Sequence, residues 1–397
     1  MSGDRISNDE SGPATVGPGL STRGYALRVV AKALVLLVAV DLLQASCHLE
    51  RKVENVSIYR YLVPPLSRID ILRDYPSRVM WPLEPLLDAH EIGRKKGPDE
   101  YRVAVLGDSG SFDLFSPSRD AIPGQIGRLG ATVAGRRVVA YNLSYQTPNT
   151  LKDLVIERHA LRRHPDAVVW FVTLYDLAQD SPPPFRPSVH LLLRTNDDDV
   201  CELAAKYGLS TWETRRMRCG SRAWWRDSLW LDGGARYRDL ATLLARGVLD
   251  ALVPGDPSNS YMPRRPWIGS SPLPEAPLFA DHGPDEPPMP NPRWATLEAG
   301  ERMARARGVP LLVVNDPIFI ASGPSSGREY NSFYARGIYD RYRIALQSYC
   351  GRRGIALLDL WNALAPHEFD NTPQHYLPEG SARIARLVVA RLQEMKP

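Results

Sequence analysis

Two side chains of this sequence could together activate a hydroxyl group for attack on an ester. Ser109 follows an apolar run, residues 103–106, and stands between Asp108 and Gly110. A serine hydroxyl is a useful nucleophile only when a base takes its proton. Of the eight histidines, His375 is the one that directly precedes the last predicted helix, which would return it to the edge that holds Ser109. Because Gly, Asp and Ser are also common turn residues, the surrounding elements must decide.

A catalytic imidazole also needs a group that orients it. Asp370 lies five residues before His375, and a loose loop would have to bring its carboxylate to the ring. Glu368 and a backbone carbonyl are alternatives for this role. With Asp370, the chain order of the three groups is Ser, Asp, His.

Five apolar runs predict the strands that would position these residues. They are residues 102–107, 137–142, 167–173, 310–315 and 355–360. Uninterrupted apolar runs are typical of strands that are covered on both faces. Helical patterns alternate with them at 149–164, 293–307, 336–352 and 378–393. We therefore predict an α/β fold with three layers, in which helices cover both faces of a five-stranded parallel sheet of the flavodoxin-like type.

Two details of this fold concern the site. In open parallel sheets the working site lies beyond the carboxyl ends of the strands, which is where Ser109 stands after the first run. The helix at 149–164 is expected to begin with a capping box made by Thr150 and Asp153.

The rest of the chain divides by composition. The predicted parts are a disordered tail at 1–24, a transmembrane signal-anchor at 25–46, a stalk or packing segment at 47–100 and a catalytic domain at 101–397. The catalytic domain carries an insertion at 177–292, which contains a Trp-rich segment and a proline-dense one. Such a density of proline excludes regular helix and central strand.

Residues 25–46 are long enough to cross a bilayer as a helix. The eleven Leu and Val residues favour insertion by about 5 kcal/mol, and Lys32 and Asp41 each cost up to about 3 kcal/mol. Insertion is thus predicted, although it is weakly driven. A cleaved signal peptide is the alternative, and a buried helix of a soluble domain ranks third. The first two interpretations both place the bulk of the protein outside the cytoplasm.

Composition and cysteine spacing narrow the function classes. A hydrophobic content of 44% supports a sizeable core and argues against global disorder. A net charge of +4 without a basic, aromatic-rich cluster gives no indication of nucleic-acid binding. The four cysteines form no CxxC pair, so no metal site is predicted. Cys201 and Cys219 could form a disulfide outside the cytoplasm or remain two buried thiols.

At this point the sequence resembles the SGNH, or GDSL, hydrolase superfamily. The matching residues are GDS at 107–109, YNLS at 141–144, TLYD at 173–176 and the pattern H…PEG…IA from His375. The resemblance covers roughly 101–176 and 310–393 and leaves the insertion unmatched. It is closest to the membrane-anchored branch associated with acylation of exported polysaccharides, through NLSYQTPNTLKDL (142–154), VNDP (314–317) and YDRYR (339–343).

The resemblance implies roles for the matched residues. Ser109 would be the nucleophile, His375 the general base, and Asp108 the brace of the nucleophile loop. The oxyanion hole would use the backbone N–H groups of Ser109 and of the second block, with an asparagine side chain from the third block.

Three departures from the family pattern affect these roles. Ser144 replaces the glycine of the second block, and its N–H group still serves if the backbone suits serine. Tyr175 stands at or near the third-block asparagine, so its hydroxyl or Asn142 would have to substitute. For Asn142, binding of the loop backbone is the preferred interpretation. Thr372 occupies the position of the usual aspartate, which makes Asp370 the candidate acid.

From the resemblance we expect a membrane-anchored, extracytoplasmic serine esterase or O-acyltransferase. Its substrate would be an acylated glycan or acyl donor, and a membrane acyltransferase is a possible partner. The alternative is a catalytically weak or inactive protein of the same fold that binds polysaccharide or such a partner. No cofactor is expected, because the loop after the first strand lacks the phosphate cradle of a flavodoxin-like cofactor domain.

Overall fold

The computed structural model describes seven segments of the chain and a few single residues. The segments are residues 22–47, 82–113, 117–178, 190–217, 293–322, 326–370 and 372–395; the single residues are 219, 234, 237, 238 and 241. Several predicted segments lie outside the described residues. They are residues 1–21 of the predicted tail, the predicted stalk from residue 48 to residue 81, and the Trp-rich and proline-dense parts of the insertion.

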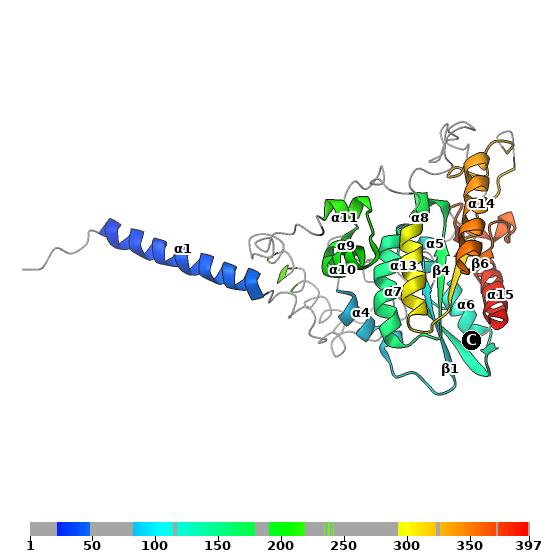
Figure 1. The fold of residues 1–397 in the computed structure, drawn as a ribbon, viewed down its shortest axis with the longest axis horizontal. Helices are drawn as coiled ribbons and strands as arrows, with labels where there is room; N and C mark the ends of the chain where they lie inside the picture. Colours follow the sequence, from blue (N-terminus) through cyan, green and yellow to red (C-terminus); the bar gives the residue numbers. More distant parts are fainter. Residues whose placement is uncertain are drawn as a thin grey trace, which may run out of the picture. The chain divides into compact units, whose positions relative to one another are not determined.

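A sheet with a parallel core organises the domain (Figure 1). Its five parallel strands are β1 (Glu100–Leu106), β3 (Arg136–Asn142), β4 (Ala167–Val172), β5 (Leu311–Asn315) and β6 (Ala356–Asp359). A sixth strand, β2 (Thr132–Val133), pairs antiparallel with β3 at the edge. The predicted α/β fold with a parallel sheet is therefore confirmed, whereas the count of five strands is wrong. The sixth strand escaped prediction because it is only two residues long.

The strand order is β2-β3-β1-β4-β5-β6. Numbered along the chain, the five parallel strands follow the order 2-1-3-4-5, which is the flavodoxin-like order. β1 is central, with β3 on one side and β4 on the other.

Helices cover both faces of this sheet and give the domain three layers. The helices that cover the sheet are α6 (Ile122–Arg128), α7 (Thr150–Ala160), α13 (Trp294–Arg305), α14 (Arg336–Arg353) and α15 (Pro378–Glu394). Helices α7, α13 and α14 contribute to one buried apolar cluster, and α6 and α15 contribute to the other. In Figure 1, α7 and α13 lie side by side over one face.

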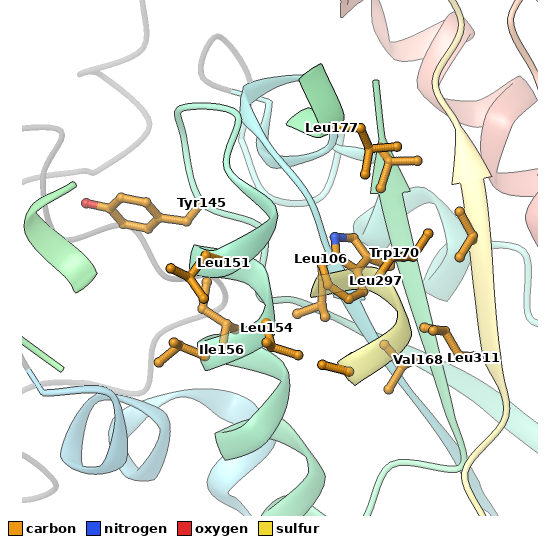
Figure 2. Close-up of a cluster of buried hydrophobic side chains, with 14 of the residues drawn as sticks. Leu106, Tyr145, Leu151, Leu154, Ile156, Val168, Trp170, Leu177, Leu297 and Leu311 are labelled. Atoms are coloured by element: carbon orange, nitrogen blue, oxygen red, sulfur yellow. The ribbon is translucent and has the colours of Figure 1, made fainter. Parts of the chain in front are cut away.

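Side chains along each strand alternate between these two clusters. On β4, Val168, Trp170 and Val172 belong to the cluster of α7 and α13, as Figure 2 shows for Val168 and Trp170. The intervening Val169 and Phe171 belong to the cluster of α6 and α15. Both faces of the strand are buried, which is why its sequence is an uninterrupted apolar run.

The start of α7 differs from the prediction. Asn149 is the N-cap, and its side-chain oxygen accepts from the N–H groups of Leu151 and Lys152. The predicted capping box of Thr150 and Asp153 is wrong, since both residues lie inside the first turn. An asparagine one position earlier satisfies the same backbone donors directly.

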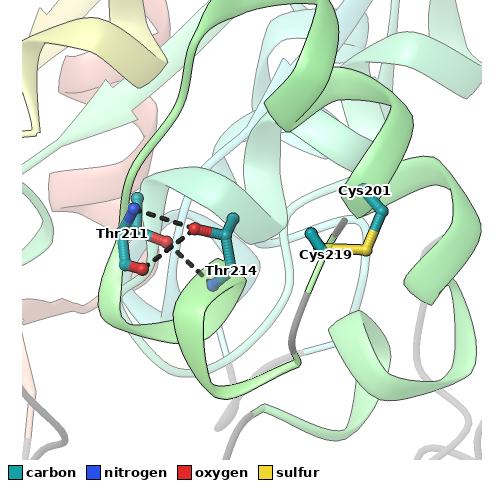
Figure 3. The surroundings of a disulfide bond; sticks show 4 residues. All are labelled: Cys201, Thr211, Thr214 and Cys219. Atoms are coloured by element: carbon teal, nitrogen blue, oxygen red, sulfur yellow. Dashed lines mark hydrogen bonds between the residues drawn. A yellow bond between two sulfur atoms is a disulfide. The ribbon is translucent and has the colours of Figure 1, made fainter. Parts of the chain in front are cut away.

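Two further segments pack around α7. Part of the predicted stalk forms α4 (Leu83–Ala89), followed by the 3-10 turn η1 (Glu91–Gly93), and α4 contacts α7. The described part of the insertion forms α9 (Leu191–Thr195), α10 (Asp197–Tyr207) and α11 (Trp212–Arg216), after the short helix α8 (Leu174–Ala178) that follows β4. Cys201 and Cys219 are joined in a disulfide here, beside the capping box of Thr211 and Thr214 (Figure 3).

The predicted signal-anchor lies in one long helix, α1 (Thr22–Cys47), which belongs to a separate unit of the chain. Its aliphatic side chains are exposed, among them Leu27, Val35 and Leu36. Among the residues that the structure describes, no helix qualifies by length and apolar character as a membrane span. A membrane role for this segment stays a prediction.

Candidate active site

Ser109 lies at the carboxyl edge of the sheet, immediately beyond β1. The chain turns at Gly107 and Asp108, and Ser109 is the first residue of the single-turn helix α5 (Ser109–Phe112). Gly107 has a φ of 153°, and a Cβ there would lie 2.3 Å from Ser111 Oγ and 2.9 Å from Phe171 Cβ. Only glycine fits such a close approach. The turn that presents Ser109 is therefore specified by Gly107.

Asp108 stabilises this turn with its side chain. Its carboxylate is buried, and Oδ1 accepts from the N–H group of Gly110 at 2.8 Å, so that Asp108 is the N-cap of α5. Ser111 adds a second support, because its hydroxyl donates to Ser144 Oγ at 2.8 Å. The resemblance implies a bracing role for Asp108, and the contact of its Oδ1 with the Gly110 N–H group is compatible with that role.

His375 is carried by a short hairpin near the C-terminus. Strand β8 (His375–Tyr376) pairs antiparallel with β7 (Phe369–Asp370), and Asp370 is the residue directly opposite His375. Side chains of directly opposite residues emerge on the same face, with Cβ atoms about 5 Å apart. A regular pairing therefore sets Asp370 beside His375, where the sequence suggested a loose loop.

The other candidate acid, Glu368, is committed to different partners. One of its oxygens accepts from Arg383 Nε at 3.0 Å, and the other accepts from the N–H group of Ala365 at 2.7 Å. These contacts cap the 3-10 turn η5 (Pro366–Glu368) and connect it to α15. Asp370 is fully buried in the hairpin instead. Of the two candidate acids, Asp370 is the one that lies opposite His375, and its role as the partner of the imidazole stays a prediction.

The segments that hold Ser109 and His375 touch each other. Helix α5 contacts β8. A Cβ on Gly110, which follows Ser109, would lie 2.8 Å from the carbonyl oxygen of Gln374, which precedes His375. The predicted nucleophile and the predicted base are thus the chain neighbours of two residues in close contact.

The segment after β5 anchors the loop of His375. The N–H group of Phe319 donates to Pro373 O at 2.9 Å, and the Tyr376 hydroxyl donates to Pro317 O at 3.0 Å. The Gln374 side chain donates to the buried hydroxyl of Tyr334. The contributions of Gln374 and Tyr334 were not predicted, because Gln is mostly exposed in proteins and Tyr is only intermediate in burial.

Burial controls the charge of His375. Removal from solvent lowers the pKa of its imidazole to about 4. The ring is therefore neutral at pH 7 and able to accept a proton, as a general base must be.

The predicted oxyanion donors of the second block have partners within the protein. Asn142 donates from Nδ2 to Phe112 O at 3.2 Å, and its Oδ1 accepts from the N–H group of Ser144 at 3.3 Å. Asn142 thus binds the loop backbone, which was its preferred interpretation. Tyr175 is buried in α8, directly after β4.

Three buried aspartates follow three adjacent strands at the same edge. Asp108 follows β1, Asp176 follows β4 and Asp316 follows β5. Burial raises the pKa of all three carboxyl groups; the mutual charges raise the pKa values of Asp176 and Asp316 further. Asp176 also accepts from the N–H and hydroxyl groups of Thr173. Within the described ranges, no three His, Cys, Asp or Glu side chains are arranged to hold a metal ion.

Comparisons with known proteins give a distant structural likeness. No family model matches the chain, and no curated protein matches its sequence. A solved structure from Desulfitobacterium hafniense DCB-2, described as a lipolytic protein of the G-D-S-L family, matches with a TM-score of 0.34 and 11% identity. The match covers 73% of this chain and 99% of that one.

Proposed function

We propose that this chain is an SGNH-type serine esterase or O-acyltransferase. Ser109 would be the nucleophile, His375 the general base and Asp370 the group that orients the imidazole. The observation that carries the proposal is the contact between α5 and β8, which brings Gly110 against Gln374, together with the pairing of Asp370 and His375.

The chemistry follows from these roles. His375 takes the proton of Ser109 as Oγ attacks the ester carbonyl carbon and forms a tetrahedral oxyanion. The oxyanion then collapses, the bond to the alcohol oxygen breaks, and the imidazolium gives its proton to that oxygen. Water or a sugar hydroxyl next attacks the acyl-enzyme, again with His375 as base, and Ser109 is regenerated.

The acceptor of the acyl group and the site of action are part of the proposal. An acyl ester of an exported or cell-surface polysaccharide is the proposed substrate, with α1 as a membrane tether and a membrane acyltransferase as a partner. The Cys201–Cys219 disulfide supports a location outside the cytoplasm, where such bonds persist. The exposed aliphatic side chains of α1 support the tether.

A serine-reactive fluorophosphonate tests the proposal directly. Intact-mass and peptide analysis should show one adduct on Ser109 in the wild-type protein and none in Ser109→Ala. Ser348→Ala, which removes an exposed hydroxyl on α14, is the matched control and should label as the wild type does. Hydrolysis of p-nitrophenyl acetate should follow the same pattern. A Ser109→Ala protein that still turned over this ester at the wild-type rate would refute the proposal.

A second candidate function is a non-catalytic binding protein of the same fold. The observation in its favour is that the Ser144 N–H group is already bonded to Asn142 Oδ1, which reduces the set of oxyanion donors. This alternative predicts no phosphonate adduct on Ser109 and no ester turnover.

A further inference from the structure

Lys152 is a fully buried lysine in the first turn of α7. Its Nζ donates to the carbonyl oxygens of Gly107, at 2.8 Å, and of Tyr145. It also forms an ion pair with Asp153 Oδ1 at 2.8 Å. Three acceptor oxygens surround the nitrogen, which matches the three N–H donors of an ammonium group. A neutral amine would have only two.

These contacts join the turn that presents the proposed nucleophile to the loop after β3. Gly107 begins the turn that presents Ser109, and Tyr145 follows β3. Gly107 O also accepts from the N–H group of Tyr145 at 3.0 Å, so the lysine binds where the two loops already meet. A shift of the ammonium group would therefore move the backbone next to Ser109.

The position of the ammonium group is itself fixed. Asp153 Oδ2 accepts from the indole N–H group of Trp170 on β4 at 3.2 Å, and both side chains are buried. A continuous set of contacts thus runs from β4 through Asp153 and Lys152 to the turn after β1. This arrangement is rigid in the sense that each polar group has a defined partner.

The charge of Lys152 also faces buried carboxyl groups. It lowers the pKa values of Asp108, Asp153 and Asp176 against the larger effect of burial, which raises them. Lys152 is the one fully buried lysine among the residues that the structure describes. It therefore provides a buried positive charge beneath the edge where an oxyanion would form.

We propose that Lys152 is a positioning residue for the reaction, which holds the Ser109 turn through Gly107 and Tyr145 and supplies the positive charge beneath it. This inference rests on the proposed esterase function. It assigns an effect on turnover to a residue for which the resemblance implied no role. A purely structural lysine would change stability and leave the turnover of the folded protein unchanged.

Lys152→Met, which keeps most of the length of the side chain and removes its charge, is the first test. On p-nitrophenyl acetate, kcat should fall by about 10²-fold with KM changed less than about threefold, the magnitude expected when a reacting group is displaced by about 1 Å. Lys206→Met removes an exposed lysine from α10 and should retain wild-type kcat. A folded Lys152→Met protein with wild-type kcat and KM would overturn the inference.

Chemical rescue separates charge from packing. Lys152→Ala removes the atoms that n-propylammonium contains, and 1-propanol has nearly the same shape without the charge. Restoration of kcat by n-propylammonium and not by 1-propanol supports the inference. Equal restoration by both compounds would show that only volume matters and would overturn it.

A measurement on the wild-type protein covers the case in which these variants do not fold. With ¹⁵N-labelled lysine, NMR should show one slowly exchanging ammonium resonance, and its shift should change when the phosphonate occupies Ser109. The inference would be overturned if that resonance were absent, or if its chemical shift were the same with and without the phosphonate adduct on Ser109. A wild-type protein without turnover and without labelling would instead refute the proposed function itself.

Discussion

Asp370 faces His375 directly across the β7–β8 hairpin. A five-residue separation along the chain is thereby converted into adjacency, because the residues between them form the turn of the hairpin. The family pattern that the sequence resembles has a spacing of three residues, so a different local structure places Asp370 opposite His375 here. The proposed acid and base thus reside on one small, buried element.

Asp370→Asn tests this pair. The asparagine keeps the shape of the side chain but no longer stabilises the imidazolium, so kcat for p-nitrophenyl acetate should fall by up to about 10⁴-fold. Glu368→Gln is the control, because Glu368 binds Arg383 and the Ala365 N–H group instead. It should lower the thermal midpoint and leave kcat within about threefold of wild type. Equal losses of kcat in both variants would contradict the assignment.

Gly110→Ala tests the contact between the nucleophile and base segments. The new methyl group would lie 2.8 Å from the backbone carbonyl of Gln374, so α5 and the His375 loop must move apart. Labelling of Ser109 by the phosphonate should slow by at least about tenfold, as expected when two reacting groups lose their alignment.

The matched control for Gly110→Ala is Gly127→Ala on α6, where no atom lies within 4 Å of the new methyl group. This substitution should raise stability by about 0.5–1 kcal/mol and leave labelling unchanged. If Gly110→Ala labelled as fast as Gly127→Ala, the two segments would not need their observed contact.

The pH dependence of kcat/KM should reflect the burial of His375. Because burial lowers the pKa of the imidazole to about 4, the ring stays unprotonated through most of the acidic range. The rate should therefore remain on its plateau down to about pH 5 and fall as the pH drops through about 4. Initial rates with a pH-insensitive ester would show this limb. A midpoint near 6.5, the ordinary value for histidine, would contradict a buried, neutral base.

Glu157 on α7 should make the domain less stable at alkaline pH. It is fully buried, and neither of its carboxyl oxygens has a hydrogen-bond partner among the described residues. Burial, with a contribution from the charges of Asp153 and Glu301, raises its pKa from 4.5 to about 8. The folded state thus binds more protons than the unfolded state between these values, and stability falls as pH rises from about 4.5 to 8.

Glu157→Gln should remove that loss. Relative to wild type, the variant should gain on the order of 4 kcal/mol in the free energy of unfolding at pH 8 and little at pH 4. Urea unfolding at both pH values measures the difference. Parallel pH profiles of the two proteins would exclude an ionisable Glu157 as the cause.

His159 links α7 to two neighbouring helices, and this link should depend on pH. Its ring nitrogens lie 2.6 Å from Glu84 Oε2 on α4 and 2.8 Å from Asp199 Oδ2 on α10. Burial disfavours the imidazolium, but the hydrogen bonds to Asp199 and Glu84 outweigh it and raise the pKa of His159. Other charged side chains around this cluster are Asp88, Arg158, Arg162, Arg163 and Glu202.

The contribution of His159 to stability should be fully present below about pH 6.5 and should be lost as pH rises through the raised pKa. Hydrogen-exchange protection of α10 amides should decrease over this range in the wild-type protein. In His159→Gln, protection should be lower at pH 6 and nearly independent of pH. Identical protection in both proteins at every pH would contradict this role.

The central strands β1, β4 and β5 were predictable because both of their faces are covered, which makes each a largely apolar run. The edge strand β2 lacks that signal, since Thr132 is exposed and only Val133 is buried. The polar residues beneath the site could not be found in this way. Lys152 and Asp153 are buried because α7 packs against the sheet and against α4, α10 and α13. The sequence of α7 alone does not predict which elements pack against it.

The candidate site shows the same division. Ser109 and His375 were identifiable from their places after a strand and before a helix. The pairing of Asp370 with His375 depends on the register of a two-residue hairpin, which residue spacing does not specify. The contact of Gln374 with Tyr334 joins positions 40 residues apart and is likewise a product of tertiary packing.

The position of β1 between β3 and β4 has one more consequence. The direction of winding across the sheet reverses between β1 and β4, and ligands of open α/β sheets bind beyond the strand ends at such a switch point. Ser109 directly follows β1 at this point. The segment after β3 is hydrogen-bonded to the turn before Ser109, and the loop that carries the imidazole is hydrogen-bonded to the segment after β5. Substitutions in the segment after β3 should therefore change how a bound carbonyl group is held, while His375 keeps its position.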